Sequence, residues 1–248
     1  MRRRDVPLTR QFIAQNIAKL TEGNPVTIEK LRSLSPVLIP DEPQAQTLLF
    51  IQRIFAPSDY INVVTRFQAA TVDGKQKCMP RGSGTTRSAS LWQDLIAKDG
   101  IPQSEAGAWV RMNPVGSGTG QGGAITDNDI QRHLHVLLEC DDVELEKQAS
   151  LLANLALPIV SITESGSRSL HALVRVACSD AVEFAQLTDE LSKRLRVLGV
   201  DTTNRNPSRL TRLPGAMRST DVGTPVMQRL VYLNPEPTRR PIVTKEVK

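Results

Sequence analysis

The chain has 248 residues, 40% of them hydrophobic and 23% charged, which is ordinary for a globular protein with a full core. It contains neither a run of 18 apolar residues nor an apolar signal segment after Met1, so we expect a cytoplasmic protein with no membrane partner. The net charge is +5, but the stretch from Lys193 onward has 12 Lys or Arg and 4 Asp or Glu, which favours a polyanionic partner such as nucleic acid.

The first half of the chain alternates between helical patterns and short strands. Residues 1–41 are expected to form a separable N-terminal helical extension, and residues 42–235 the main domain. The elements expected before the first acidic motif are helices at Thr9–Leu20, Thr27–Leu34, Glu42–Phe55 and Ser90–Lys98, strands at Tyr60–Phe67 and Ala108–Met112, and loops at Thr71–Arg87 and Val115–Ala124.

The second half of the chain has the clearest helix, at Asp180–Leu198, which Ser179 or Asp180 can cap. Residues 236–248 are expected to form a basic, Pro-containing tail or linker. The other elements expected here are a helix at Val143–Leu155 and strands at Pro158–Thr163, Leu170–Val176 and Gln228–Leu233. Strand pairs interrupted by helices predict an α+β fold, with an RRM-like antiparallel sheet core covered by helices.

The segment HVLLECDDVELE, from His135 to Glu146, is the most informative in the chain. It predicts a strand that enters the core and ends in acids, and alternation along a strand puts Glu139 and Asp141 on one face. Two carboxylates on one rigid face repel each other unless a cation neutralises them, and hard divalent cations prefer oxygen ligands. The same pattern is also typical of a strand that ends in a solvated acidic turn.

Two later segments bear on that choice. Ser169-Leu170-His171 opens a second apolar strand, and Val200-Asp201 offers a third acid. The segment Asn206–Gly215, with the sequence NPSRLTRLPG, follows it and contains Arg209 and Arg212. The chain order is therefore paired acids, small-x-His, a third acid and then arginines.

This order of motifs resembles the archaeo-eukaryotic primase (AEP) superfamily. It looks most like the primase-polymerase (prim-pol) domains at the N-termini of phage and plasmid replication proteins, which are often fused to a helicase. The resemblance covers approximately Thr47 to Pro237 and includes GAWVRMNP at Gly107–Pro114. Glu139 stands where many relatives carry Asp, and either side chain can ligate a metal.

The resemblance implies a DNA primase or polymerase that works by two-metal nucleotidyl transfer in phage, prophage or plasmid replication. Its cofactor would be Mg²⁺ or Mn²⁺, and no zinc is expected, because the three cysteines are scattered without a C-x-x-C pair. Its partners would be a single-stranded DNA template, NTP or dNTP, and a helicase domain in cis or in trans. The expected residues are Glu139, Asp141 and Asp201 as catalytic metal ligands, Ser169, His171, Arg209 and Arg212 for nucleotide, and Arg111 and Asn113 for nucleic acid.

Two other functions fit parts of the sequence. His133-Leu134-His135, with His171 as a third imidazole, matches the metal-binding pattern of HUH nicking and replication-initiation endonucleases. That chemistry needs a tyrosine nucleophile, and the only tyrosines are Tyr60 and Tyr232, neither in a helical context. A non-catalytic nucleic-acid-binding module with the same fold is the third possibility.

Overall fold

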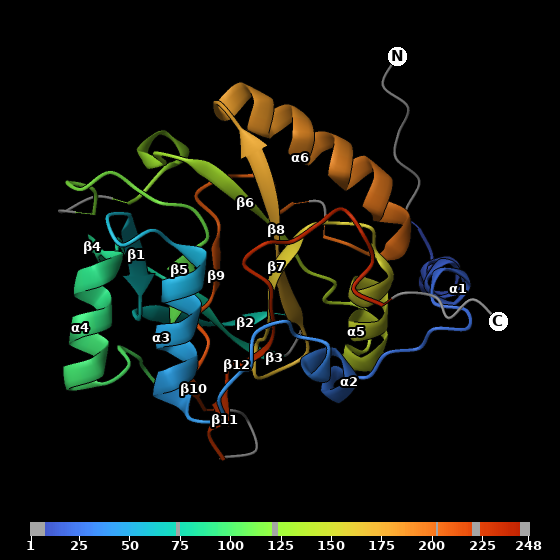
Figure 1. Cartoon of the computed structure of the whole chain (residues 1–248), viewed down its shortest axis with the longest axis horizontal. Helices are drawn as coiled ribbons and strands as arrows, with labels where there is room; N and C mark the ends of the chain where they lie inside the picture. The colour runs from blue at the N-terminus through green and yellow to red at the C-terminus, as the bar shows by residue number, and fades with distance from the viewer. Residues whose placement is uncertain (1–7, 73–74, 121–123, 202, 220–223, 244–248) are drawn as a thin grey trace.

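The computed structural model of the chain describes residues 8–72, 75–120, 124–201, 203–219 and 224–243. Part of the expected loop at 115–124 and the end of the expected tail at 236–248 lie outside the described residues. Within these ranges, no helix combines the length and the apolar character needed to cross a bilayer. The chain has an α+β fold in which helices cover antiparallel sheets, as the sequence predicts (Figure 1).

Two four-stranded sheets form the framework, and every strand pair in them is antiparallel. The first sheet has the order β4-β1-β5-β9 and consists of β1 (Tyr60–Val64), β4 (Thr85–Ser88), β5 (Trp109–Arg111) and β9 (Leu210–Arg212). The second has the order β12-β7-β8-β6 and consists of β6 (His133–Leu138), β7 (Ile159–Glu164), β8 (Leu170–Cys178) and β12 (Arg229–Leu233).

The second sheet contains a split β-α-β unit, because β8 lies between β6 and β7 and a helix connects those two strands. The fourth strand, β12, lies on the outer side of β7 and comes long after the helix that follows β8. The sheet is thus antiparallel and helix-covered, as expected, while the RRM-like detail of the prediction is not confirmed.

Helices pack on both sheets around one continuous apolar core. They are α1 (Arg10–Leu20), α2 (Ile28–Ser33), α3 (Pro43–Ile54), α4 (Ala89–Asp99), α5 (Leu145–Asn154) and α6 (Ala181–Leu195). In α6, the Asp180 side chain accepts hydrogen bonds from the backbone N–H groups of Val182 and Glu183, as a capping residue does. Ile17 of α1 and Leu31 of α2 belong to the same buried cluster as Phe50 of α3. The first helices therefore pack on the main domain, and the division at residues 41 and 235 stays a prediction.

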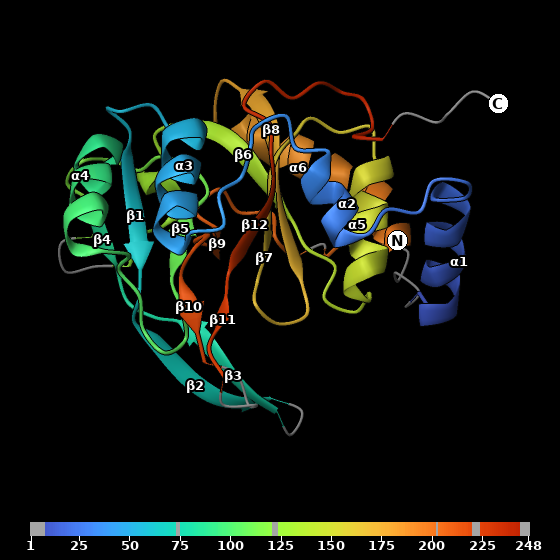
Figure 2. The same ribbon diagram turned by 60° about the horizontal axis from the view of Figure 1, so that its bottom comes forward.

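Two hairpins complete the fold. One consists of β2 (Phe67–Val72) and β3 (Lys75–Pro80), and the other of β10 (Met217–Arg218) and β11 (Val226–Met227). The first hairpin extends away from the body of the molecule (Figure 2). Its strands, and β4, cover residues 71–72, 75–80 and 85–87 of the segment for which the sequence predicts a loop. That prediction is wrong.

The turn after β9 is fixed by close packing at Gly215. Its backbone N–H donates to Gln228 O at 2.7 Å, and Thr47 Oγ1 of α3 donates to Pro214 O at 2.6 Å. Gly215 has φ +87°, and a Cβ atom there would lie 2.1 Å from Pro43 O. Only glycine fits this approach of the turn to α3, which explains the glycine of the RLPG segment and holds β9 in place.

Candidate active site

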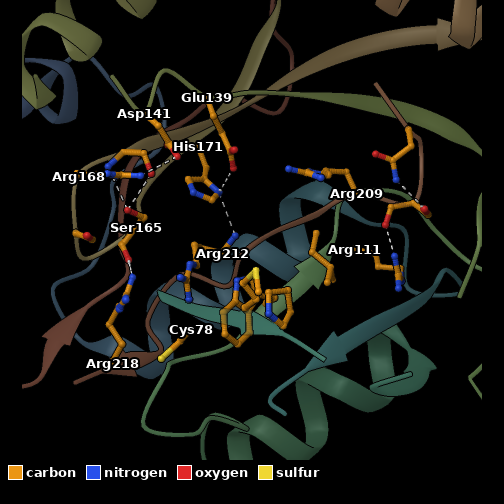
Figure 3. Close-up of a pocket in the computed structure, with 18 of the residues that line it drawn as sticks. Cys78, Arg111, Glu139, Asp141, Ser165, Arg168, His171, Arg209, Arg212 and Arg218 are labelled. Atoms are coloured by element: carbon orange, nitrogen blue, oxygen red, sulfur yellow. Dashed lines mark hydrogen bonds and ion pairs between the residues drawn. The ribbon is translucent and has the colours of Figure 1, made fainter. Parts of the chain in front are cut away.

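A cavity of about 920 Å³ lies where the two sheets meet. The first sheet contributes side chains from β5 and β9, and the second contributes β8, the segment after β6 and the turn between β7 and β8 (Figure 3). Seven of the nine predicted site residues line it: Arg111, Glu139, Asp141, Ser169, His171, Arg209 and Arg212. The structure therefore brings together residues from motifs that are far apart in the sequence.

Glu139 and Asp141 face the cavity because of the residue between them. Cys140 is buried in the core, with 2% of its surface exposed, so alternation of the extended chain turns its two neighbours the other way. Both carboxylates line the cavity just beyond the end of β6. This placement agrees with the alternation predicted from the sequence.

Glu139 is held by two side chains. Asn204 Nδ2 donates to Oε2 at 2.8 Å, and His171 Nδ1 lies 3.1 Å from Oε1. Burial raises the pKa of Glu139, and the nearby Asp201 adds to the rise, while the Asn204 hydrogen bond and the Arg209 charge oppose it. A carboxylate with a raised pKa is one whose negative charge is under-compensated, so a cation in the cavity would stabilise it.

His171 is neutral in this environment. Burial first, and then the charge of Arg212, lower the pKa of its ring to about 3. Its contact with Glu139 is therefore not an ion pair. Nδ1 also lies 3.2 Å from Thr211 Oγ1 and 3.4 Å from the Arg212 backbone N. Among the described residues no hydrogen bond is made to Nε2, which leaves that nitrogen for a ligand.

Asp201 lies beside Glu139 but is not among the residues that line the cavity. Its backbone N–H donates to Glu139 O at 2.8 Å, so the two residues are neighbours as predicted. Its carboxylate accepts hydrogen bonds from the Thr203 backbone N–H and hydroxyl, each at 2.8 Å. In the described part of the chain, no three His, Cys, Asp or Glu side chains gather closely enough to hold a metal ion.

Five arginines and two carboxylates line the cavity, so it is strongly positive. Arg212 is buried, stacks on the Trp109 ring at 4.3 Å and donates to Ala106 O at 2.9 Å. Arg168 lies 3.6 Å from Asp141 Oδ2. The five arginines are Arg111, Arg168, Arg209, Arg212 and Arg218.

Part of this lining lies outside the residues predicted from the sequence motifs. Arg168, Ser165 and Ser167 belong to the turn between β7 and β8, and Arg218 donates to Ser165 O at 3.4 Å. Ser169, which was predicted, donates from Oγ to Ser165 Oγ at 3.2 Å. The sequence did contain a signal, since Gly166-Ser167-Arg168 directly precedes the Ser-x-His motif.

Arg111 and Asn113 take different positions from each other. Arg111 lines the cavity, donates to Ser208 O and has its pKa lowered by burial. Asn113 is fully buried, and its amide binds backbone groups: Nδ2 donates to His135 O and Pro207 O, and Oδ1 accepts from the N–H groups of Leu134 and His135. The prediction that Asn113 contacts nucleic acid does not fit this position, because no polar atom of the amide is left over.

Asn113→Ala is therefore expected to destabilise the protein. Asn113 serves backbone groups of β6 at the point where the register with β8 shifts, and its loss leaves buried donors and acceptors unpaired. We expect a loss of about 3 kcal/mol, or about 10 °C in Tm. Thermal unfolding measures it, with Asn128→Ala at an exposed position as the control. An unchanged Tm together with weaker DNA binding would instead restore Asn113 as a nucleic-acid contact.

The three histidines do not form a common metal site. His135 is fully buried, with its ring packed edge-on against Phe55 and Nδ1 2.8 Å from Met112 O. The His133 ring packs against Phe184 of α6 instead, and only His171 lines the cavity. This arrangement contradicts the HUH alternative, which needs the three imidazoles around one ion.

Comparison with known proteins gave two similar structures. No protein-family model matches the chain, and no curated protein matches its sequence. The crystal structure of primase RepB' is 16% identical and has a TM-score of 0.45, over 78% of this chain and 58% of that chain. The crystal structure of the catalytic domain of primase RepB' in complex with initiator DNA is 16% identical, with a TM-score of 0.41, over 74% of this chain and 84% of that one. The chain thus spans somewhat more than half of the length of the first of these structures.

Proposed function

We propose that the chain is a primase-polymerase, which joins NTP or dNTP on a single-stranded DNA template in the replication of a phage, prophage or plasmid. The observation that carries the proposal is the meeting of Glu139, Asp141 and His171 with five arginines in one cavity. Carboxylates alone would repel a nucleotide triphosphate, and arginines alone would only bind it. The combination is what transfer of a nucleotidyl group requires.

The arginines would hold the triphosphate. A guanidinium presents a planar fork of donors that matches phosphate oxygens, and burial strengthens such bonds. Arg212 is fixed by Trp109 and Ala106, so its geometry is set before a ligand arrives. Arg209 and Arg168 line the same cavity from other segments of the chain and would bind further oxygens.

Glu139 and Asp141 fit a divalent cation such as Mg²⁺ or Mn²⁺, because both offer oxygen donors to the cavity. Asp201 is a third ligand in this proposal, since it adjoins Glu139. To reach an ion, its carboxylate must leave Thr203. The bound ion would neutralise charge on the transferring phosphate and lower the pKa of the attacking hydroxyl.

His171 would donate a hydrogen bond from Nε2 to a phosphate oxygen. A neutral ring can do so only when Nδ1 carries no proton and accepts hydrogen bonds. The Thr211 hydroxyl and the Arg212 backbone N–H lie on that side and support this tautomer. In the other tautomer Nδ1–H donates to Glu139 and Nε2 carries no proton. The Glu139 carboxylate therefore favours this second tautomer, and a phosphate oxygen at Nε2 favours the first.

The test is synthesis on a single-stranded template with labelled nucleotides and Mg²⁺ or Mn²⁺. We expect products longer than the labelled primer, or new short products where no primer is supplied. Retention of template without any product would leave a binding module, the third possibility that the sequence allows. A covalent adduct between tyrosine and DNA would restore the nicking enzyme.

A further inference from the structure

The described residues of the β2–β3 hairpin attach it to the body through one face. Phe67 and Cys78 pack on the small buried cluster of Val64, Ala106 and Trp109. On the other face of the hairpin, where Gln68 pairs with Met79, Gln68 is exposed and 46% of the Met79 surface is accessible. A two-stranded hairpin is marginally stable by itself. A bound partner on the open face would therefore stabilise this extended hairpin.

The charge of this region indicates what the partner is. Residues 65–88 contain five Lys or Arg and one Asp, a net charge of +4. Arg66 and Arg81 flank the base of the hairpin, where Arg81 N donates to Arg66 O at 2.9 Å, and both side chains are exposed. Like charges facing each other across paired strands are destabilising. No ion pair of the described chain includes either residue, so a polyanion would relieve this repulsion.

The hairpin also reaches the candidate active site. Cys78, Met79 and Pro80 of β3 line the same cavity as Glu139 and Arg212. The cationic base of the hairpin, at Arg81, therefore directly follows residues that line the cavity. The Met79 side chain is flexible and polarisable, which suits contact with the face of an unpaired base.

We propose that the β2–β3 hairpin binds the backbone of the single-stranded template and leads it to the cavity. Arg66 and Arg81 would contact its phosphates, and Met79 would contact a base at the entrance. This inference rests on the proposed function, which supplies the need for a template. The hairpin lies outside the motifs that the sequence singles out.

The test compares Arg66→Gln/Arg81→Gln with the native chain in binding a fluorescent single-stranded DNA, without nucleotide or divalent metal. We expect about tenfold weaker binding at moderate salt, and a log K against log salt slope that is shallower by about 1.4, from two lost phosphate contacts. Arg239→Gln/Arg240→Gln, at two exposed positions of the tail, is the matched control and should bind almost normally.

Two outcomes would overturn the hairpin proposal: unchanged binding by the Arg66/Arg81 variant, or an equal loss in the tail control. The first leaves the cavity and its chemistry intact, because the assay contains no nucleotide. Binding of NTP or dNTP alone should be the same in the native chain and the Arg66/Arg81 variant. Failure of nucleotide incorporation by the native chain would count against the proposed function and not against the hairpin.

Discussion

Asp141→Asn is expected to lower nucleotide incorporation by roughly 10³-fold while the protein stays folded. The Asp141 carboxylate faces the cavity and is half-exposed, and its contact with Arg168 is a long one at 3.6 Å between two partly solvated groups. Such a pair adds little to stability, so Tm should stay nearly constant. The amide keeps the size of the side chain but removes the negative charge that would attract a divalent cation. Single-turnover incorporation measures the effect.

Asp142→Asn provides the matched control. Asp142 adjoins Asp141, is exposed, does not line the cavity and pairs with Arg10 at 3.4 Å. It should retain activity within about twofold, because exposed pairs of this kind contribute little. Near-native activity in both the Asp141 and the Asp142 variant would remove the acidic pair from the mechanism. Equal loss in both would point to a general charge effect and not to a ligand.

Elements with a strong local pattern could be predicted from the sequence. The apolar spacing of α6 and the capping Asp180 belong to the segment itself, and the structure confirms both. The alternation that turns Glu139 and Asp141 to one side is equally local, because it needs only an extended chain with Cys140 buried. These features depend on the local sequence and not on contacts with distant segments.

The hairpin and β9 could not be recognised in the same way. The polar, Gly-containing composition of residues 71–87 predicts a loop, although Asp73-Gly74 is also a sequence signal for a two-residue hairpin turn. β9 is three residues long and pairs with β5, about a hundred residues earlier in the chain. β9 is a strand because it pairs with β5, so no local sequence pattern predicts it.

The parts of the site that were missed depend on tertiary contacts. Arg168 and Arg218 come from turns and reach the cavity only because the two sheets and their hairpins meet there. Asn113 shows the opposite error, since a polar residue close to a predicted strand looks available to a ligand. Only the packing of β6 and the loop before β9 around it reveals that the backbone uses the amide completely.

Arg212→Lys is expected to weaken nucleotide binding by about 30-fold, which corresponds to the loss of about 2 kcal/mol of charge-assisted hydrogen bonding. Lysine cannot reproduce the planar fork or the stacking of the guanidinium on Trp109 at 4.3 Å. Burial lowers the pKa of Arg212 to about 9, so arginine remains protonated at neutral pH. Lysine has a lower ordinary pKa than arginine, and the same burial would bring the lysine pKa closer to neutral pH.

The pH dependence of binding distinguishes loss of the positive charge from loss of the planar guanidinium geometry. Binding of an anionic triphosphate requires the protonated side chain, so the affinity of the lysine variant should fall further between pH 7 and pH 8.5, while the native chain changes little. Arg87→Lys is the control, because Arg87 also lies over a tryptophan, at 5.9 Å from the Trp92 ring, but outside the cavity. Equilibrium binding of NTP or dNTP at both pH values measures this change in affinity for the native chain and both variants. If the Arg212 and Arg87 variants bind nucleotide equally well, Arg212 does not hold the triphosphate, and the positive charge of the cavity serves another ligand.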